Sequence, residues 1–355
     1  MDVCICAESA VEFWRIWRIF GSAGLSEMGI RPSQRFVRSW QSCILGERMP
    51  VFETPTAPWV RRLLESEGRR LSAPVEFYAS GGTRRSYSQS RVSIVLPSQI
   101  HPGDIVAVNE HVFVTAPELS LMTATRDCCR GEALSLINEF CGTYATNVAA
   151  PKGFVPAKPV ASREALLRFC DAHLDWTPAI LFRTTADHAI DNCASPAESI
   201  TALLLCLPVR DGGYGLPLPQ MNSVILPNDG AKELADRNYY VGDAVWPASM
   251  TIVEYDSKAE HTDCDAVTHD HVRKLALENC GYHVSVVTPI ILADSVLFEK
   301  VALDTARRVG HRFRLRTDPA AYRAKQREVR EALISFPKRW WFSWAPSTDL
   351  RRGQL

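Results

Sequence analysis

The stretch YYVGDAVWPASMTIVEYDSK, residues 239–258, holds two short apolar runs separated by a Pro-Ala-Ser-Met segment. If Ala248 and Ser249 form the tip of a hairpin, its register opposes Trp246 to Thr251, Val245 to Ile252, Ala244 to Val253 and Asp243 to Glu254. Directly opposed residues have Cβ atoms roughly 4.5–5.5 Å apart, so both carboxylates can reach one cation. Like charges in such positions destabilise a sheet, and a hard divalent metal with oxygen ligands is the simplest use for them.

The alternative for Asp243 and Glu254 is a pair of solvated carboxylates on an exposed hairpin. Both runs are otherwise apolar enough to be central strands of a sheet, which favours the metal-ligand interpretation.

The length and composition predict a two-domain α/β protein. The chain has 355 residues, 46% of them hydrophobic, and a formal net charge of zero. This length is long for one core. The pattern of apolar runs and breaks divides the chain into five regions. They are a helical region (1–74), a small β-rich unit with closing helices (75–150), a linker with a helix (151–190), an α/β domain (191–310) and a basic, Trp-rich tail (311–355).

The cysteines and the hydropathy predict a cytoplasmic protein that does not cross a membrane. Eleven cysteines are scattered without the spacing of a disulfide framework or a zinc site, and an odd number of thiols fits a reducing compartment. Asp2, Glu8 and Glu12 argue against a signal peptide. No stretch approaches the ~18 apolar residues of a membrane span.

The first half of the chain predicts helices around a small sheet. A helix from Ala7 to Phe20 has aromatic residues at helical spacing, a pattern more typical of core than of a nucleic-acid surface. A second helix is expected from Trp59 to Leu71, with loop between them over 29–58. Short β-branched and aromatic runs predict strands at 75–78, 92–96, 105–108 and 111–114. Helices follow near 117–126, 131–141 and 162–173, and residues 150–162, rich in Pro, Ala and Lys, are expected to be a linker.

The second half predicts the order helix, three strands, helix, strand, helix. Ser195 as N-cap, Pro196 at the first helical position and Glu198 three residues after the cap begin a helix that runs to about Leu207. The later elements are expected at 221–226, the two hairpin strands, 267–279, 282–288 and 295–308.

This order, with an Asp on the second strand and E-x-K-like residues on the third, resembles the PD-(D/E)XK nuclease superfamily, most closely its very-short-patch-repair-like group. The likeness spans roughly 193–290 and rests on Ser195-Pro196-x-Glu198, Gly242-Asp243, Ile252-Val253-Glu254-Tyr255-Asp256, His261, Asp270-x-x-Arg273 and Gly281-Tyr282-His283-Val284. It implies a restriction-endonuclease-like αβββαβ domain, a DNA endonuclease activity that depends on Mg²⁺ or Mn²⁺, and Asp243 and Glu254 as metal ligands.

The resemblance also implies roles for the neighbouring residues. An acid on the first helix reaches the metal, which assigns Glu198 to the site, although its place in a capping box needs no catalytic role. Asp256 stands where the superfamily usually has Lys. Three alternatives stay open: Lys258, on the same strand face, supplies the cation, Asp256 is a third ligand, or the site is inactive. His261 assists proton transfer, and Arg273 lies near the phosphate or braces the sheet.

A fainter likeness covers about 75–127, where the run from Val92 to Pro117 resembles abortive-infection antitoxin proteins. It implies the alternative of a catalytically inactive DNA-binding regulator, with a possible toxin or other protein partner. At the carboxyl end, Lys338 and Arg339 precede tryptophans in a combination that suits phosphate contact and stacking, although packing of these tryptophans on the protein is the favoured alternative.

Overall fold

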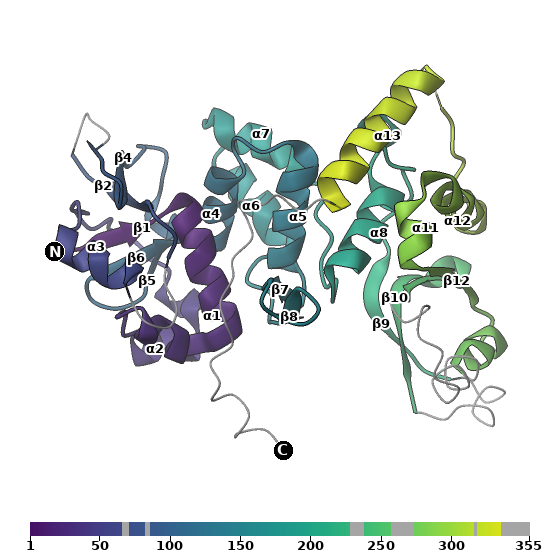
Figure 1. Cartoon of the computed structure of the whole chain (residues 1–355), viewed down its shortest axis with the longest axis horizontal. Coiled ribbons are helices and arrows are strands. Elements are labelled where there is room, and N and C mark those ends of the chain that lie inside the picture. The colour runs from purple at the N-terminus through teal and green to yellow at the C-terminus, as the bar shows by residue number, and fades with distance from the viewer. Residues whose placement is uncertain (66–70, 82–85, 228–237, 257–272, 316–317, 335–355) are drawn as a thin grey trace. The chain divides into compact units, whose positions relative to one another are not determined.

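The computed structural model describes residues 1–65, 71–81, 86–227, 238–256, 273–315 and 318–334. The chain divides between Ala189 and Ile190 into two compact units, which run from purple to teal and from teal-green to yellow in Figure 1. Each unit combines helices with a mixed sheet. The predicted α/β class is therefore confirmed at this level.

The first unit is built on a six-stranded sheet with the order β3-β4-β2-β1-β6-β5. Its strands are β1 (Val3–Ile5), β2 (Val75–Ala79), β3 (Ser86–Tyr87), β4 (Arg91–Val95), β5 (Ile105–Ala107) and β6 (Val112–Thr115). Strand β1 lies centrally, antiparallel to β2 and parallel to β6. The sequence did not predict β1, because three residues directly before a helix carry no readable alternation.

The first helix, α1 (Ala7–Glu27), supplies much of this unit's core. Phe13 and Trp14 are fully buried, and the Trp14 indole N–H donates to the Thr115 carbonyl at 2.9 Å. The core interpretation of these two aromatic residues is confirmed. The same helix places Arg15 against Glu139 in a fully buried, two-pronged ion pair with N–O distances of 2.7 and 2.6 Å.

The remaining helices of the first unit are α2 (Gln34–Arg38), α3 (Ala57–Leu64), α4 (Pro117–Ala124), α5 (Arg130–Cys141), α6 (Arg163–Ala172) and α7 (Thr177–Ala186). The elements of this unit differ from the expectation at four places: α3 ends at Leu64 and not at Leu71, α7 was not expected, and the segments 29–58 and 150–162 contain a helix and a strand. Residues 29–58 were expected to be loop, yet they contain α2, where Ser33 Oγ accepts from Phe36 N. The expected linker 150–162 contains β8 (Phe154–Pro156), which pairs with β7 (Tyr144–Thr146). Both pieces are too short for a periodic signal.

The second unit is built on a four-stranded sheet with the order β12-β11-β10-β9. Its strands are β9 (Gln220–Ile225), β10 (Tyr240–Trp246), β11 (Thr251–Tyr255) and β12 (His283–Val287). Strand β10 is antiparallel to both neighbours, and β12 is parallel to β11. The predicted hairpin register is confirmed for Trp246 with Thr251 and for the next two pairs.

Helices cover the two faces of this sheet. On one face a cluster of buried side chains joins the strands to the helical residues 273–279: Ile225, Tyr240, Val245, Ile252, Ala276, Leu277 and Val284. Helix α8 (Pro196–Cys206) packs against β10 and β11. Helices α11 (Pro289–Ala293), α12 (Ser295–Arg308) and α13 (Pro319–Ile334) complete the unit. Among the described residues, no helix combines the length and apolar character that crossing a membrane requires.

Candidate functional site

At Asp243 the main-chain pairing of β10 with β11 gives way to a hydrogen bond between a side chain and the main chain. Ladder pairing extends from Trp246 to Ala244, which lies opposite Val253. At the next position the carboxylate of Asp243 accepts a hydrogen bond from the main-chain N–H of Tyr255, with an Oδ2–N distance of 2.8 Å. A side chain thus occupies the space between two central strands, and it satisfies a main-chain donor there.

The strand next to Asp243 does not alternate regularly. A Cβ atom on Gly242 would lie 2.6 Å from Val245 Cγ2 and 3.3 Å from Ile252 Cγ2, both in the core cluster. In a regular strand, Gly242 and Val245 would face opposite sides. The alternation is therefore interrupted between them, a device that re-aims side chains in many active sites. Glycine is required here because the core leaves no room for a larger residue.

Asp243 lies among other acids. It is partly buried, and burial, followed by the charge of Glu198, raises the pKa of Asp243 to about 6; Asp256 acts in the same direction. The hydrogen bond from Tyr255 and the charge of Arg273 oppose these effects. The local negative charge exceeds the positive charge that faces Asp243, an arrangement that favours a cation.

Glu198 is held firmly at the start of α8. Its Oε1 accepts from Ser195 Oγ at 2.9 Å, and its Oε2 accepts from Ala194 N and Asn222 Nδ2, each at 2.8 Å. The predicted N-cap is confirmed, since Ser195 Oγ also accepts from Glu198 N at 3.2 Å. These donors occupy both oxygens, so Glu198 acts on Asp243 through its charge.

Asn222 is a member of this group that the sequence did not reveal. It lies on β9 in a left-handed conformation with φ of 49°, and its position faces Asp243 by the register of β9 with β10. The sequence feature that could have revealed Asn222 is its position as a polar residue inside a run that is otherwise typical of a strand. The register of β9 with β10 was not readable from the sequence, because the connection between these strands is too long for a short hairpin turn to set it.

Glu254, which was expected to be a metal ligand, forms an ion pair with Arg273 in the structure. Its Oε1 accepts from Arg273 Nη2 at 2.6 Å, and the same nitrogen donates to the carbonyl of Val241 at 2.6 Å. Arg273 therefore links the helix 273–279 to both hairpin strands. The resemblance implied that Arg273 lies near the phosphate or braces the sheet, and in the structure it contacts the sheet at Val241 and a carboxylate at Glu254.

Five further predicted site residues follow strand β11 in the sequence. Asp256 follows β11, is partly buried, and donates its main-chain N–H to Val287 O at 3.0 Å. Lys258 and His261 lie outside the described residues, as do Lys338 and Arg339. Within the described part of the chain, no group of three or more His, Cys, Asp or Glu side chains is arranged to hold a metal ion.

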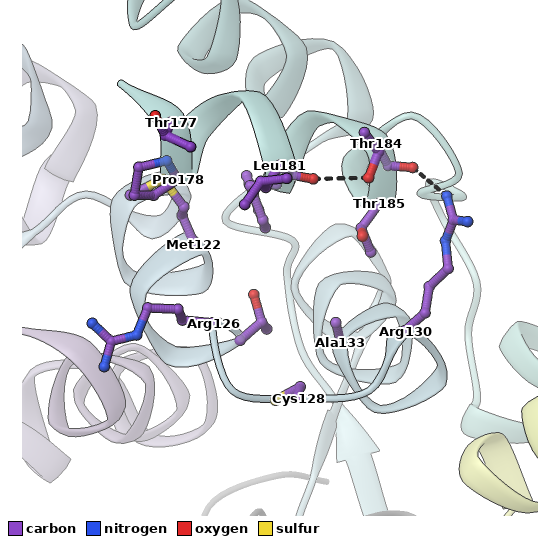
Figure 2. Close-up of a pocket in the computed structure, with 12 residues that line it drawn as sticks. Met122, Arg126, Cys128, Arg130, Ala133, Thr177, Pro178, Leu181, Thr184 and Thr185 are labelled. Carbon is purple, nitrogen blue, oxygen red and sulfur yellow. Dashed lines mark hydrogen bonds between the residues drawn. The ribbon is translucent and has the colours of Figure 1, made fainter. Parts of the chain in front are cut away.

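The first unit has a pocket of its own, about 530 Å³ in volume, between α7 and the junction of α4 with α5. Figure 2 shows Arg130 reaching across to the main-chain carbonyl of Thr184. Leu181, Met122 and several threonines line the space. The charged residues that line it are two arginines, Arg126 and Arg130, with no acid or histidine among the lining residues, so the pocket offers no reaction chemistry comparable with that around Asp243.

Comparisons with known proteins found no match for this chain, whether among protein-family models, curated proteins or solved structures.

Proposed function

We propose that the second unit is a restriction-endonuclease-like domain that hydrolyses DNA phosphodiester bonds with Mg²⁺ or Mn²⁺. The observation that carries the proposal is the position of the Asp243 carboxylate, inserted between two central strands and surrounded by acids. The order of elements, with α8 before three antiparallel strands and a helix before the parallel β12, supports the same assignment.

The residues around Asp243 fit a magnesium ion with few protein ligands. Oδ2 of Asp243 is used by Tyr255, and Oδ1 accepts no hydrogen bond from the described residues. Magnesium usually keeps several waters and binds through one or two carboxylates plus substrate phosphate. An arrangement without three converging carboxylates is therefore compatible with it. Asp243 would hold the ion, and the charges of Glu198 and Asp256 would strengthen its binding.

When bound, such an ion lowers the pKa of a coordinated water and stabilises the charge that develops on the phosphate. The protein positions the groups around it. The hydrogen bond from Tyr255 fixes the Asp243 carboxylate, and Asn222 fixes Glu198. Arg273 holds Glu254 in place and lends positive charge to the site. In this proposal His261 and Lys258 serve proton transfer and water positioning.

The test compares the wild-type protein with Asp243→Asn on supercoiled plasmid, with Mg²⁺, Mn²⁺ or a chelator. Asn keeps an oxygen for the Tyr255 hydrogen bond and removes the charge, so the fold should persist. We expect nicking or cleavage by the wild type with metal and none by the variant. Glu328→Gln, which removes an exposed acid on α13, should retain full activity. Metal-dependent cleavage that survives in Asp243→Asn would reject the site.

A second candidate is a DNA-binding regulator without catalysis. Two observations favour it: Asp256 stands in the position where the superfamily has Lys, and Glu254 is already neutralised by Arg273 at 2.6 Å. It predicts duplex binding that survives loss of the carboxylates in Asp243→Asn and Glu254→Gln, together with no turnover by any form of the protein. Cleavage that depends on Asp243 would exclude it.

A further inference from the structure

A second pocket, in the second unit, lies along the carboxyl-terminal half of α12 and the segment that follows this helix. Its volume is about 720 Å³. Leu303, Ala306 and Phe313 provide apolar lining, and the other described side chains that line it are basic: Lys300, Arg307, His311 and Arg312. No acidic residue is among the lining residues. The pocket thus combines an apolar surface with a concentration of positive charge.

The segment that forms this pocket is fixed against the unit. Helix α12 ends in a left-handed Gly310 with φ of 70°, and His311 N donates to Ala306 O at 2.8 Å. This geometry is a Schellman-type cap, which satisfies the last helical carbonyls. Phe313 then packs on Tyr214 and Tyr322 with ring centroids 5.6 and 6.0 Å apart. Its neighbour Arg312 is therefore held beside the pocket.

The acids of α12 do not neutralise the pocket. Asp304 pairs with Arg307 at 2.8 Å and with Arg308 at 2.9 Å, and Glu299 pairs with Arg323 on α13 at 2.8 Å. Lys300 and Arg312 are exposed and form no ion pair with another described residue, although main-chain hydrogen bonds and then the charge of Lys300 lower the pKa of Asp294 at the start of α12. Their charge remains available to a ligand.

The helix dipole explains only part of this charge. Cations in the last turn of a helix are favourable, which accounts for Arg307 and Arg308. Lys300 lies two turns before the end of α12, and Arg312 lies beyond it. The cap described above already satisfies the terminal carbonyls. The dipole of α12 therefore does not account for Lys300 and Arg312.

We propose that this pocket binds a nucleotide of a nucleic-acid strand. Lys300 and Arg312 contact the phosphate, while the base and sugar lie against Leu303 and Phe313. A bare phosphate or an acidic peptide would use the charges and leave the apolar lining unused, whereas a nucleotide uses both. The inference goes beyond the proposed cleavage chemistry, because it concerns binding that requires no metal.

The experiment measures binding of a fluorescein-labelled single-stranded oligodeoxynucleotide by anisotropy, in chelator, over a range of salt concentrations. The variants are Lys300→Gln/Arg312→Gln and a matched control that removes two basic residues outside the pocket, Arg308→Gln/Arg327→Gln. We expect the pocket variant to reduce the magnitude of the slope of log affinity against log salt by about 1.4, or ~0.7 for each lost contact with a single-strand phosphate. The control should change it by less than half as much.

Photo-crosslinking with a bromodeoxyuridine-substituted strand adds a readout that does not depend on charge. Crosslinks within residues 300–313 are expected. The unlabelled strand should reduce these crosslinks more strongly than a free mononucleotide or polyglutamate does. Equal losses in the two double variants, crosslinks confined to other segments, or competition by polyglutamate at equal charge would each overturn the proposal. A free mononucleotide that competes as well as the strand would also overturn it. Because chelator is present throughout, failure here is distinct from failure of the cleavage proposal.

Discussion

Glu12 on α1 is a buried acid whose ionisation opposes folding. It is 3% exposed, its Oε2 accepts from Ser72 N at 2.6 Å, and burial raises the pKa of Glu12 to about 7. The folded state therefore holds the proton more tightly than the unfolded chain, where the pKa of Glu is about 4.3. Its contribution to stability is full below about pH 4 and is lost as the pH rises through about 7.

Glu12→Gln should remove this pH dependence, because the amide keeps an acceptor for Ser72 and cannot ionise. We expect equal free energies of unfolding near pH 4 and a gain for the variant of at most about 3 kcal/mol near pH 8. Urea denaturation across this pH range measures it. Glu27→Gln, an exposed change on the same helix, serves as the control. Parallel pH profiles for wild type and Glu12→Gln would show that Glu12 is not the group responsible.

Gly242 is the residue on which the geometry of Asp243 depends. A methyl group there would overlap Val245 at 2.6 Å, and inserting a methyl into a filled core usually costs roughly 1–3 kcal/mol. Gly242→Ala should lose about this much stability in thermal unfolding and bind Mn²⁺ more weakly. Gly46→Ala, with open space around the added atom, should do neither. Unchanged stability and metal affinity in Gly242→Ala would mean that the strand is regular.

The start of helix α8 has two roles, the capping of the helix by Ser195 and the effect of the Glu198 charge on the candidate metal site. Two substitutions separate these roles. Ser195→Ala removes the acceptor for Glu198 N and should cost about 1 kcal/mol of stability. Glu198→Gln keeps an oxygen for Ala194 and Asn222 and removes the charge that acts on Asp243. We expect Mg²⁺ affinity, measured by calorimetry, to fall in Glu198→Gln and to stay near the wild-type value in Ser195→Ala. The opposite pattern would leave Glu198 with capping alone.

At the scale of helices and strands, the features that the sequence predicted correctly are those set by neighbouring residues. Three pairs of the hairpin register followed from placing the turn at Ala248 and Ser249, and the cap of α8 followed from Ser195, Pro196 and Glu198. Contacts between distant segments could not be predicted, because their register depends on packing. Asn222 beside Glu198 and Arg273 against Glu254 are of this kind. The strands β1 and β8 were missed since three residues carry no period.

At the scale of the whole molecule, the division into two units has a consequence for stability. The first unit contains the fully buried pair of Arg15 and Glu139, whose carboxylate also accepts from Thr146 N and Oγ1, each at 3.1 Å. Removing one partner of such a pair leaves a buried charge and typically costs 3–5 kcal/mol. Arg15→Met should therefore destabilise the first unit strongly. The second unit has a separate core around Val245 and Ile252.

Hydrogen exchange followed by mass spectrometry tests this division. In Arg15→Met we expect faster exchange throughout α1, α5 and the sheet of the first unit, with unchanged protection in β10 and β11. The double variant Arg15→Met/Glu139→Gln removes both charges and should recover much of the loss, because no unpaired charge stays buried and Gln keeps an acceptor for Thr146. Equal loss of protection in both units would show that the chain unfolds as one cooperative body. Independent unfolding would let the site around Asp243 keep its geometry when the first unit is perturbed.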